Sequence, residues 1–303
     1  ISIDPNHINA RNNLSILLRS AQFRNIEGEN FKELFLMLFR RNDIDHGEIF
    51  MNAKLILLSQ KKYVKLVETV NSSSSILKKL IIQNLLKDEL FLLILQKSLV
   101  ADYFLEKMLK KLRCEILFSL IDSPKHFLKE NFEFIISLSE QCFFNEYVFA
   151  QTKKEINYVN KLKHKIEKNK KISEIEVVIL GCYVPLYSNT KIIKKLSKYK
   201  SDNTLFNDLI IMQIQEPMKE KEIENSITSL SKISDNVSKK VRDQYEENPY
   251  PRWRYTYTNL PSNFLIKFNN QIRPNEIKIE NKFDKPNVLV AGCGTGHHIC
   301  IAE

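Results

Sequence analysis

Three closely spaced glycines near the end of the chain have the pattern of a nucleotide-binding loop. The stretch NVLVAGCGTGHHICIAE, residues 287–303, contains Gly292, Gly294 and Gly296, half of the six glycines in the chain. Glycine allows a sharp reversal and lets the backbone approach a ligand without an obstructing Cβ. A branched apolar run precedes these glycines and an amphipathic helix start follows them. The order strand, glycine loop, helix predicts the first unit of a doubly wound nucleotide-binding fold, with free N–H groups facing an anion or acceptor.

The spacing within this loop distinguishes two classes of nucleotide. A dinucleotide fingerprint has glycine at its first, third and sixth positions, but the sixth position here is His297. The G-x-G-x-G spacing instead resembles motif I of class I S-adenosylmethionine-dependent methyltransferases, for which a VLDxGCGTG phrase is typical. Val290 stands where that motif commonly has an acidic residue, so the contact of that carboxylate with the cofactor is in doubt. The carboxylate for the ribose hydroxyls is expected about 20 residues beyond the loop.

A second motif, QYEENPYPRW, spans residues 244–253 and contains the only tryptophan of the chain. Local physics favours a helix over SDNVSKKVRDQYEEN, capped by Ser234 or Asp235, which stops near Asn248 because a proline follows. An extended aromatic turn would come after it. The Asn-Pro-Tyr-Pro text half-resembles the catalytic Asn-Pro-Pro-Tyr element of amino-methyltransferases. We reject that interpretation because such an element ends a buried apolar strand, whereas the residues before Asn248 are polar and helical.

Taken together, three segments resemble one family more closely than either motif does alone. SEQCFFNEYVF, VRDQYEENPYPRW and NVLVAGCGTG, in this order, are similar to bacterial tetratricopeptide-repeat-containing class I methyltransferases. In that family a repeat array leads into a helical segment, then the Pro-Tyr-Pro-Arg-Trp element, then a Rossmann-like catalytic domain. The opening DPNHINARNNLSILLRSAQF adds a resemblance to a repeat junction over about twenty residues, although an ordinary capped amphipathic helix explains it equally well.

The resemblance implies S-adenosyl-L-methionine as the cofactor and leaves the methyl acceptor undefined. The implied cofactor-binding residues are Tyr245, Gly292, Cys293, Gly294, Thr295, Gly296 and His297. Residues 245–253 would form a lid over the cofactor, and the catalytic candidates in it are Glu246, Glu247, Tyr250, Arg252 and Trp253. The two aromatic rings would pack on the sulfonium or adenine, the arginine would meet an acidic acceptor, and a glutamate would act as base. Alternatively, these residues simply dock the helical domain onto the Rossmann sheet.

The elements that must position these residues are helices. Apolar residues in YFLEKMLKKLRCEI recur at spacings of three, four and one, and FEFIISLSEQCFFNEYVF shows the same period. Proline is sparse before residue 240, and five of the nine prolines lie in the last 55 residues, which indicates a boundary there. We predict a mainly α chain with three parts: the end of a tetratricopeptide-like array (1–40), an all-helical domain (41–235), and a lid or linker followed by a Rossmann-like start (236–303).

Charge, cysteine content and hydropathy indicate which ligands, partners and location to expect. The net charge is +10, but the lysines alternate with acidic or apolar residues, and the densest run, KLKHKIEKNKK, lacks stacking aromatics. Nucleic-acid binding is therefore possible but not favoured, and a solvated helix face is the simpler interpretation. The five cysteines form no CxxC pair, and no apolar run is long enough to cross a membrane. We expect a cytoplasmic protein without a metal site, since Cys293, His297, His298 and Cys300 match no zinc spacing.

The leading hypothesis is therefore a methyltransferase whose helical region recruits a protein partner or substrate. The alternative is a helical protein–protein interaction module attached to another nucleotide-binding domain of the NAD or FAD type. Residue 1 is Ile, and the glycine loop lies close to residue 303. We therefore expect the sequence to be a fragment truncated at both ends. These 303 residues, with one strand of the sheet, are expected to have no measurable methyl transfer and at most feeble cofactor affinity.

Overall fold

The structure is a computed structural model in which helices dominate. It describes residues 7–23, 29–58, 60–72, 74–122, 125–228, 234–247, 252–257, 263–278, 289–290, 292 and 294–296. These residues include no β-strand, so the mainly helical prediction is confirmed for the part described. Most of the predicted Rossmann strand and helix lies outside the described residues. Leu289 and Val290, which are described, have no strand assignment.

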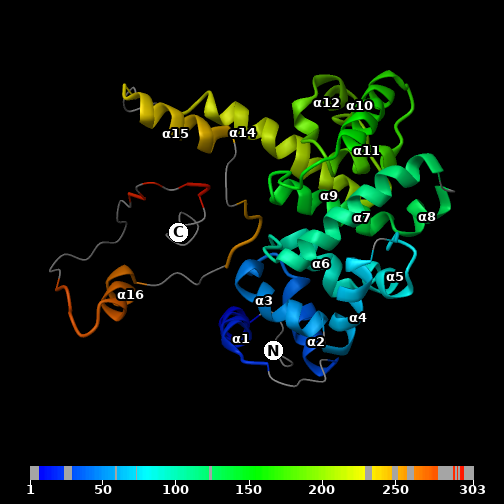
Figure 1. The fold of residues 1–303 in the computed structure, drawn as a ribbon. Helices are drawn as coiled ribbons and strands as arrows, with labels where there is room; N and C mark the ends of the chain where they lie inside the picture. Colours follow the sequence, from blue (N-terminus) through cyan, green and yellow to red (C-terminus); the bar gives the residue numbers. More distant parts are fainter. Residues whose placement is uncertain are drawn as a thin grey trace.

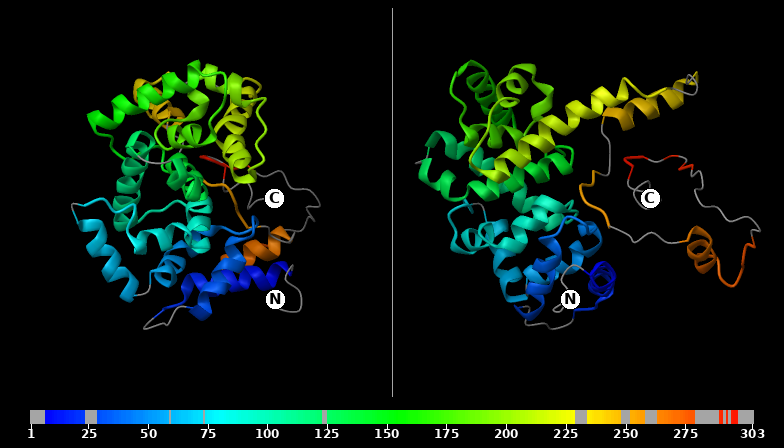
Figure 2. Two further views of the ribbon diagram at one scale, coloured as in Figure 1. Left: turned by 90° about the vertical axis from the view of Figure 1, so that its right-hand side faces the viewer. Right: turned by 180° about the vertical axis from the view of Figure 1, so that it is seen from behind.

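The helices follow one another with short connections. They are α1 (Ile8–Ser20), α2 (Glu29–Phe39), α3 (His46–Leu57), α4 (Gln60–Asn71), α5 (Leu80–Leu86), α6 (Glu89–Lys97), α7 (Tyr103–Asp122), α8 (Lys125–Glu130), α9 (Phe132–Phe144), α10 (Lys153–Lys168), α11 (Glu174–Gly181), η1 (Leu186–Ser188), α12 (Thr190–Leu196), α13 (Thr204–Ile210), η2 (Ile211–Gln215), α14 (Glu216–Glu224), α15 (Asn236–Glu247) and α16 (Phe264–Gln271). Helices α1 to α13 stack into one elongated body. Helices α14 and α15 project from this body as an arm (Figures 1 and 2).

A single hydrophobic cluster holds the body together. It extends from Leu18 on α1 to Ile214 on η2, and it continues across the boundary predicted near residue 40. Helix α9 packs against α6 on one side and α11 on the other, so it lies at the centre of the body. The periodicity of residues 103–116 predicted one face of α7, on which Leu105, Met108, Leu109, Leu112 and Ile116 are buried, whereas Phe104 is only half-buried.

Helix α9 ends earlier than its apolar pattern predicted. The predicted face continues to Tyr147, but the helix stops at Phe144. Glu146 and Tyr147 then adopt positive φ angles of 53° and 56°, and the Tyr147 N–H donates to the Cys142 carbonyl over 2.9 Å. This hydrogen bond satisfies a carbonyl at the helix end, as left-handed residues do in C-terminal capping motifs. The turn also directs the Glu146 side chain into the site described below.

Helices α13, η2 and α14 form one continuous helix interrupted by a π-helical turn. The turn covers Ile211–Gln215 and ends two residues before Pro217. Proline has no N–H, and its ring clashes with the carbonyl four residues earlier, so a regular α-helical ladder cannot continue through this point. The wider turn places Gln213 inside the body, where its Nε2 donates to the Ser139 carbonyl over 3.0 Å.

The predicted repeat junction is only partly described. Asp4, Pro5 and Asn6 lie outside the described residues, and α1 packs against α3. The His7 side chain caps α1 by accepting a hydrogen bond from the Ala10 N–H over 3.2 Å. The tetratricopeptide assignment stays a prediction. Among the described helices, none has both the length and the apolar character needed to cross a bilayer.

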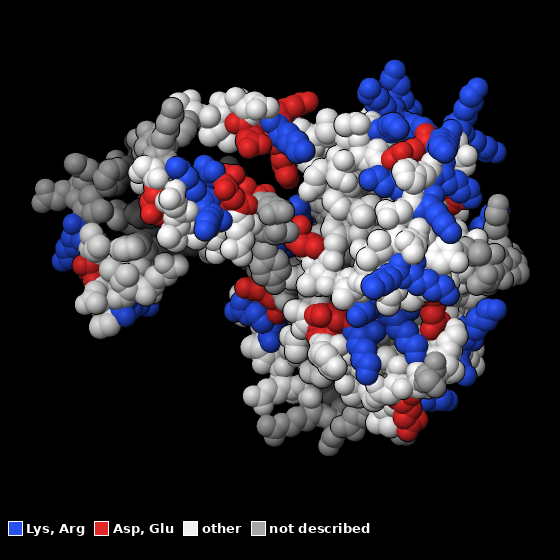
Figure 3. Space-filling view, turned by 45° about the horizontal axis from the view of Figure 1, so that its top comes forward, with Lys and Arg blue, Asp and Glu red and all other residues white. Residues whose placement is uncertain are grey.

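Surface charge on the body is mixed. Figure 3 shows lysine and arginine side chains gathered along one side of the visible face, with acidic residues between them. Elsewhere in the described structure lysines pair with carboxylates, as in Lys165–Glu176 at 2.8 Å and Lys54–Asp102 at 2.6 Å. Such pairing is expected of solvated helix faces and reduces the field available to a polyanion.

Replacing Gly181 with alanine is expected to lower the free energy of unfolding by about 3 kcal/mol. A Cβ at Gly181 would lie 2.5 Å from Ser139 Oγ and 3.2 Å from Gln213 Oε1. Both side chains are fully buried, so neither can move aside freely. Urea unfolding followed by circular dichroism measures the loss. Adding Ser139→Ala removes the clashing oxygen and should restore much of the stability, whereas simply additive losses would contradict this explanation.

Candidate functional site

An extended segment, residues 252–257, lies along the helical body and is called the strap here (Figure 1). Its side chains bind to helices that are far apart in the sequence. Arg252 pairs with Glu146 and Arg254 pairs with Asp208. The Tyr257 hydroxyl donates to Glu48 Oε2 over 2.8 Å and lies 2.9 Å from Ser15 Oγ. The strap is therefore fixed from the end of α9 to α1 and α3.

Arg252 is held by both charge and ring contact. Its guanidinium carbon lies 4.3 Å from the centre of the Phe143 ring, and its Nε donates to Glu146 Oε1. Burial raises the pKa of the Glu146 carboxyl above its ordinary value, and the Arg252 cation opposes this shift. The acidic partner of Arg252 in this structure is thus Glu146, from within the SEQCFFNEYVF segment.

Arg254 lies next to a buried carboxyl group. Its Nη1 is 3.7 Å from Glu140 Oε1, and its Nη2 is 2.6 Å from Asp208 Oδ1. The Glu140 side chain is only 1% exposed. Burial raises the pKa of Glu140 to about 8, while the Arg254 cation acts to lower it. Lys97 also acts to lower this pKa, so the charged form of the buried carboxyl depends on two nearby cations.

Trp253 lies between these two arginines and contacts the glycine loop. Its Nε1 donates to the Thr295 carbonyl over 3.0 Å. Gly292, Gly294 and Gly296 have φ angles of 68°, 53° and 88°, a region that residues with a Cβ rarely adopt. Within the described structure, no heavy atom lies within 4 Å of the position a Cβ would take at these glycines. The glycines are therefore required by backbone conformation, and the space above them is open.

A cavity of about 650 Å³ separates the glycine loop from the body. The loop contributes three residues, the strap contributes three, and helices α9, η2 and α14 contribute most of the rest: Phe143, Phe144, Met212, Glu216, Glu220, Ile223, Ile227, Arg252, Trp253, Arg254, Gly294, Thr295 and Gly296. This volume is within the range of small-molecule and cofactor sites. The lining combines apolar and aromatic side chains with the carboxylates of Glu216 and Glu220 on α14.

The carboxylates of Glu216 and Glu220 distinguish this cavity from a phosphate site. They are four residues apart on the arm helix, so they share one face of it. No ion pair of either is present among the described residues, whereas Arg252 and Arg254 both have carboxylate partners. The unneutralised charge in the lining is therefore negative. It suits a ligand with a cationic group and disfavours a pyrophosphate.

The predicted site residues are only partly brought together. Trp253, Arg252, Gly294, Thr295 and Gly296 line the cavity, and Gly292 belongs to the same loop. Tyr245, by contrast, is 66% exposed on α15, and Glu246 on that helix lies 3.6 Å from Arg242; neither lines the cavity. Glu247 is the last residue of α15. Tyr250, Cys293 and His297 lie outside the described residues, as do His298 and Cys300.

Four acidic residues of the site were missed by sequence reasoning. Glu140 and Glu146 belong to the SEQCFFNEYVF segment, but their role depends on arginines more than 100 residues later. Glu216 and Glu220 are in a helix whose polar composition gives no sign that one face lines a cavity. The sequence could have indicated the first pair, because a glutamate within an apolar helical segment needs a buried partner.

Helix α15 confirms its predicted ends and cap. Asp235 Oδ2 accepts a hydrogen bond from the Ser238 N–H over 2.7 Å, and the helix ends at Glu247. Val237, Val241 and Tyr245 follow one another at a spacing of four residues and so share one face of the helix, and all three are exposed. The periodicity identified which residues lie on one side of the helix, but no described element covers that side.

Sequence and structure comparisons add no relative from which the site could be interpreted. No known protein family, curated protein or solved structure matches the chain significantly.

Proposed function

We propose that the chain belongs to a class I S-adenosylmethionine-dependent methyltransferase, in which the helical body forms one wall of the cofactor cavity. The observation that carries this proposal is the meeting of three segments at one cavity. Phe143 and Phe144 come from SEQCFFNEYVF, Trp253 comes from the Pro-Arg-Trp element, and Thr295 comes from the glycine loop. These are the three segments that resemble the methyltransferase family, and their contact is expected if they serve one ligand.

The charge in the cavity supports S-adenosylmethionine over a dinucleotide. A sulfonium is a cation, which carboxylates and aromatic faces attract. Glu216, Glu220 and the Trp253 ring supply both kinds of group in the lining. A dinucleotide would bring a pyrophosphate to the same lining, where the two arginines already have carboxylate partners.

The residues of this chain would hold and shield the cofactor. When bound, S-adenosylmethionine supplies an electrophilic methyl group on sulfur, and transfer then depends on alignment and exclusion of water. The backbone of Gly294–Gly296 would approach the ligand, and Trp253 would fix that backbone through Thr295. Arg252 and Arg254 would act as positioning residues, because their ion pairs hold the strap that carries Trp253.

The helical body gives this enzyme a surface for a protein partner or substrate. We further propose a cytoplasmic location, because the described cysteines Cys114, Cys142 and Cys182 are free thiols, which is usual in a reducing compartment. The acceptor of the methyl group would be presented from the open side of the cavity. The competing function, a helical interaction module on an NAD- or FAD-binding domain, differs in the ligand it predicts.

Trp253→Phe is expected to weaken binding of S-adenosylhomocysteine about fivefold in the full-length protein. Phenylalanine keeps an aromatic ring but removes the hydrogen bond to the Thr295 carbonyl. Titration calorimetry measures the dissociation constant, and Tyr245→Phe is the matched control because its exposed hydroxyl lies outside the cavity. Binding of NAD without binding of S-adenosylhomocysteine by the folded protein would overturn the proposed function.

A further inference from the structure

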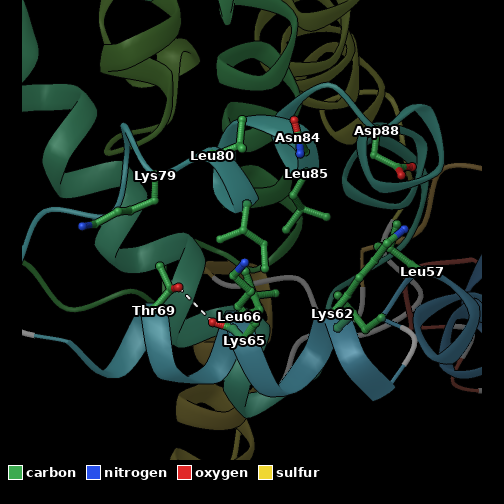
Figure 4. A pocket seen from close by; sticks show the side chains of 12 residues that line it. Leu57, Lys62, Lys65, Leu66, Thr69, Lys79, Leu80, Asn84, Leu85 and Asp88 are labelled. Carbon is green, nitrogen blue, oxygen red and sulfur yellow. Dashed lines mark hydrogen bonds between the residues drawn. The ribbon is translucent and has the colours of Figure 1, made fainter.

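A second cavity, the lysine groove, lies between α4 and α5, away from the strap. It has a volume of about 470 Å³, and helix α4 forms one wall while α5 and the residue before it form the other. Figure 4 shows Leu66 and Leu85 in the middle of the groove and Leu80 at its rim. None of its lining residues also lines the cavity at the glycine loop.

The floor of the lysine groove is apolar and partly open to solvent. Leu66 and Leu85 are buried at its base, whereas Leu80 at its rim is 76% exposed. A ligand that covers this exposed leucine removes apolar surface from water, which stabilises the complex. Isolated exposed leucines are common, but here the leucine is continuous with a hollow of ligand size.

Three lysines surround this apolar surface. In Figure 4 Lys79 lies at one end of the groove, Lys62 at the other, and Lys65 between them. Within the described part of the chain, no ion pair or hydrogen bond involves the ammonium group of any of the three. The one carboxylate in the lining, Asp88, pairs with Lys32 over 2.7 Å. The groove therefore presents unneutralised positive charge along its whole length.

We propose that the lysine groove binds an acidic amphipathic helix of a partner protein. Such a helix presents apolar side chains at i, i+3 and i+4, with carboxylates on both sides of that stripe. The leucines would cover the stripe, and the lysines at both ends and in the middle would meet carboxylates. A fatty-acid anion has one charged end and needs an enclosed tunnel, and nucleic acid would leave the leucines exposed.

This proposal does not depend on methyl transfer, because the lysine groove and the glycine-loop cavity share no residues. Binding at the groove can therefore fail while cofactor binding succeeds, and the reverse. If both hold, the groove supplies the recruiting surface of the enzyme.

The test uses a fluorescein-labelled helical peptide of about 18 residues with a leucine stripe flanked by glutamates. Fluorescence anisotropy should show saturable binding to the 303-residue chain. The triple variant Lys62→Glu, Lys65→Glu, Lys79→Glu should bind about tenfold more weakly, and Leu80→Gln about fivefold more weakly. The matched control is Lys168→Glu, Lys194→Glu, Lys200→Glu, which makes the same charge change at exposed sites away from the groove; its affinity should stay within about twofold.

Three results would overturn the proposal. One is no binding of the peptide at up to about 1 mM, a concentration at which even weak docking is visible. Another is equal weakening by the groove variant and the control, which would indicate attraction to the net charge alone. The third is displacement of the bound peptide by palmitate or by a single-stranded RNA oligonucleotide at lower concentration than an unlabelled copy of the peptide.

Discussion

Replacing Arg254 with alanine should lower the free energy of unfolding by about 2 kcal/mol, and by nearly the same amount at about pH 7.5 and about pH 5.5. Arg254 is the cation nearest the buried Glu140 carboxyl, at 3.7 Å. Without it Asp208 loses its ion pair, and the Glu140 carboxyl, which faces Asp208 and keeps only Lys97 as a nearby cation, stays protonated at both pH values. Urea unfolding of the variant and the native chain at both pH values measures the effect.

The pH dependence follows from the direction of the Glu140 shift. Burial raises the pKa of Glu140 to about 8 in the folded protein from an ordinary value of 4.5. Between these values the folded state holds more protons than the unfolded state, so stability falls as pH rises. Removing Arg254 raises this pKa further, but the folded protein already holds most of this proton below pH 8, so the fall stays nearly the same. Titration of His46, whose pKa is lowered to about 3 by burial, occurs in both proteins and largely cancels in the comparison.

Glu140→Gln provides the control for this prediction. With or without Arg254 it removes the buried carboxyl, so the fall in stability between the two pH values should become about 2 kcal/mol smaller. Measurements stay at or below about pH 7.5 because burial lowers the pKa of the neighbouring Lys97 to about 8. A fall in stability with pH that Glu140→Gln leaves unchanged would contradict the raised pKa of Glu140.

Arg113→Met should lower the free energy of unfolding by about 4 kcal/mol. Arg113 is fully buried on α7, with its guanidinium carbon 4.2 Å from the centre of the Tyr183 ring and its Nη2 3.8 Å from Glu155 Oε1. The same Nη2 donates to the Phe149 carbonyl over 3.1 Å. Methionine fills much of the volume but leaves Glu155 without its buried cation. The urea midpoint, followed by circular dichroism, measures the loss.

An exposed arginine serves as the matched control. Arg242 on α15 pairs with Asp243 at the surface, so Arg242→Met should leave the midpoint unchanged within error. Arg113→Lys keeps the charge but lacks the planar fork that reaches several acceptors, and its stability should lie between those of Arg113→Met and the native chain. A native-like midpoint for Arg113→Met would contradict a structural role for this buried cation.

Local patterns in the sequence predicted local structure well. Apolar spacing identified the buried face of α7, and Asp235 with the proline after Asn248 predicted both ends of α15. Both depend on neighbours within a few residues, where helix geometry is fixed. The end of α9 was wrong by three residues, because the apolar pattern continues through Tyr147 while the backbone has already turned left-handed.

The cavity could be predicted only in part. The glycine spacing indicated the loop, and the positive φ angles agree with that interpretation. The pairing of Arg252 with Glu146 joins residues 106 positions apart, and no local pattern encodes it. The bond between Trp253 and Thr295 likewise depends on how the strap lies against the body. Sequence periodicity specifies faces of helices, and tertiary packing then decides which faces meet.

The strap also has a consequence for the order in which the molecule is assembled. The contact between Tyr257 and Ser15 closes a loop of 242 positions, which contains nearly every helix of the body. Helical contacts that are local in sequence form before contacts of such long range, and the N-terminal helices leave the ribosome first. We therefore expect the strap to dock last, on a body that has already folded. The cavity beside the glycine loop would then exist only in chains whose earlier folding has succeeded.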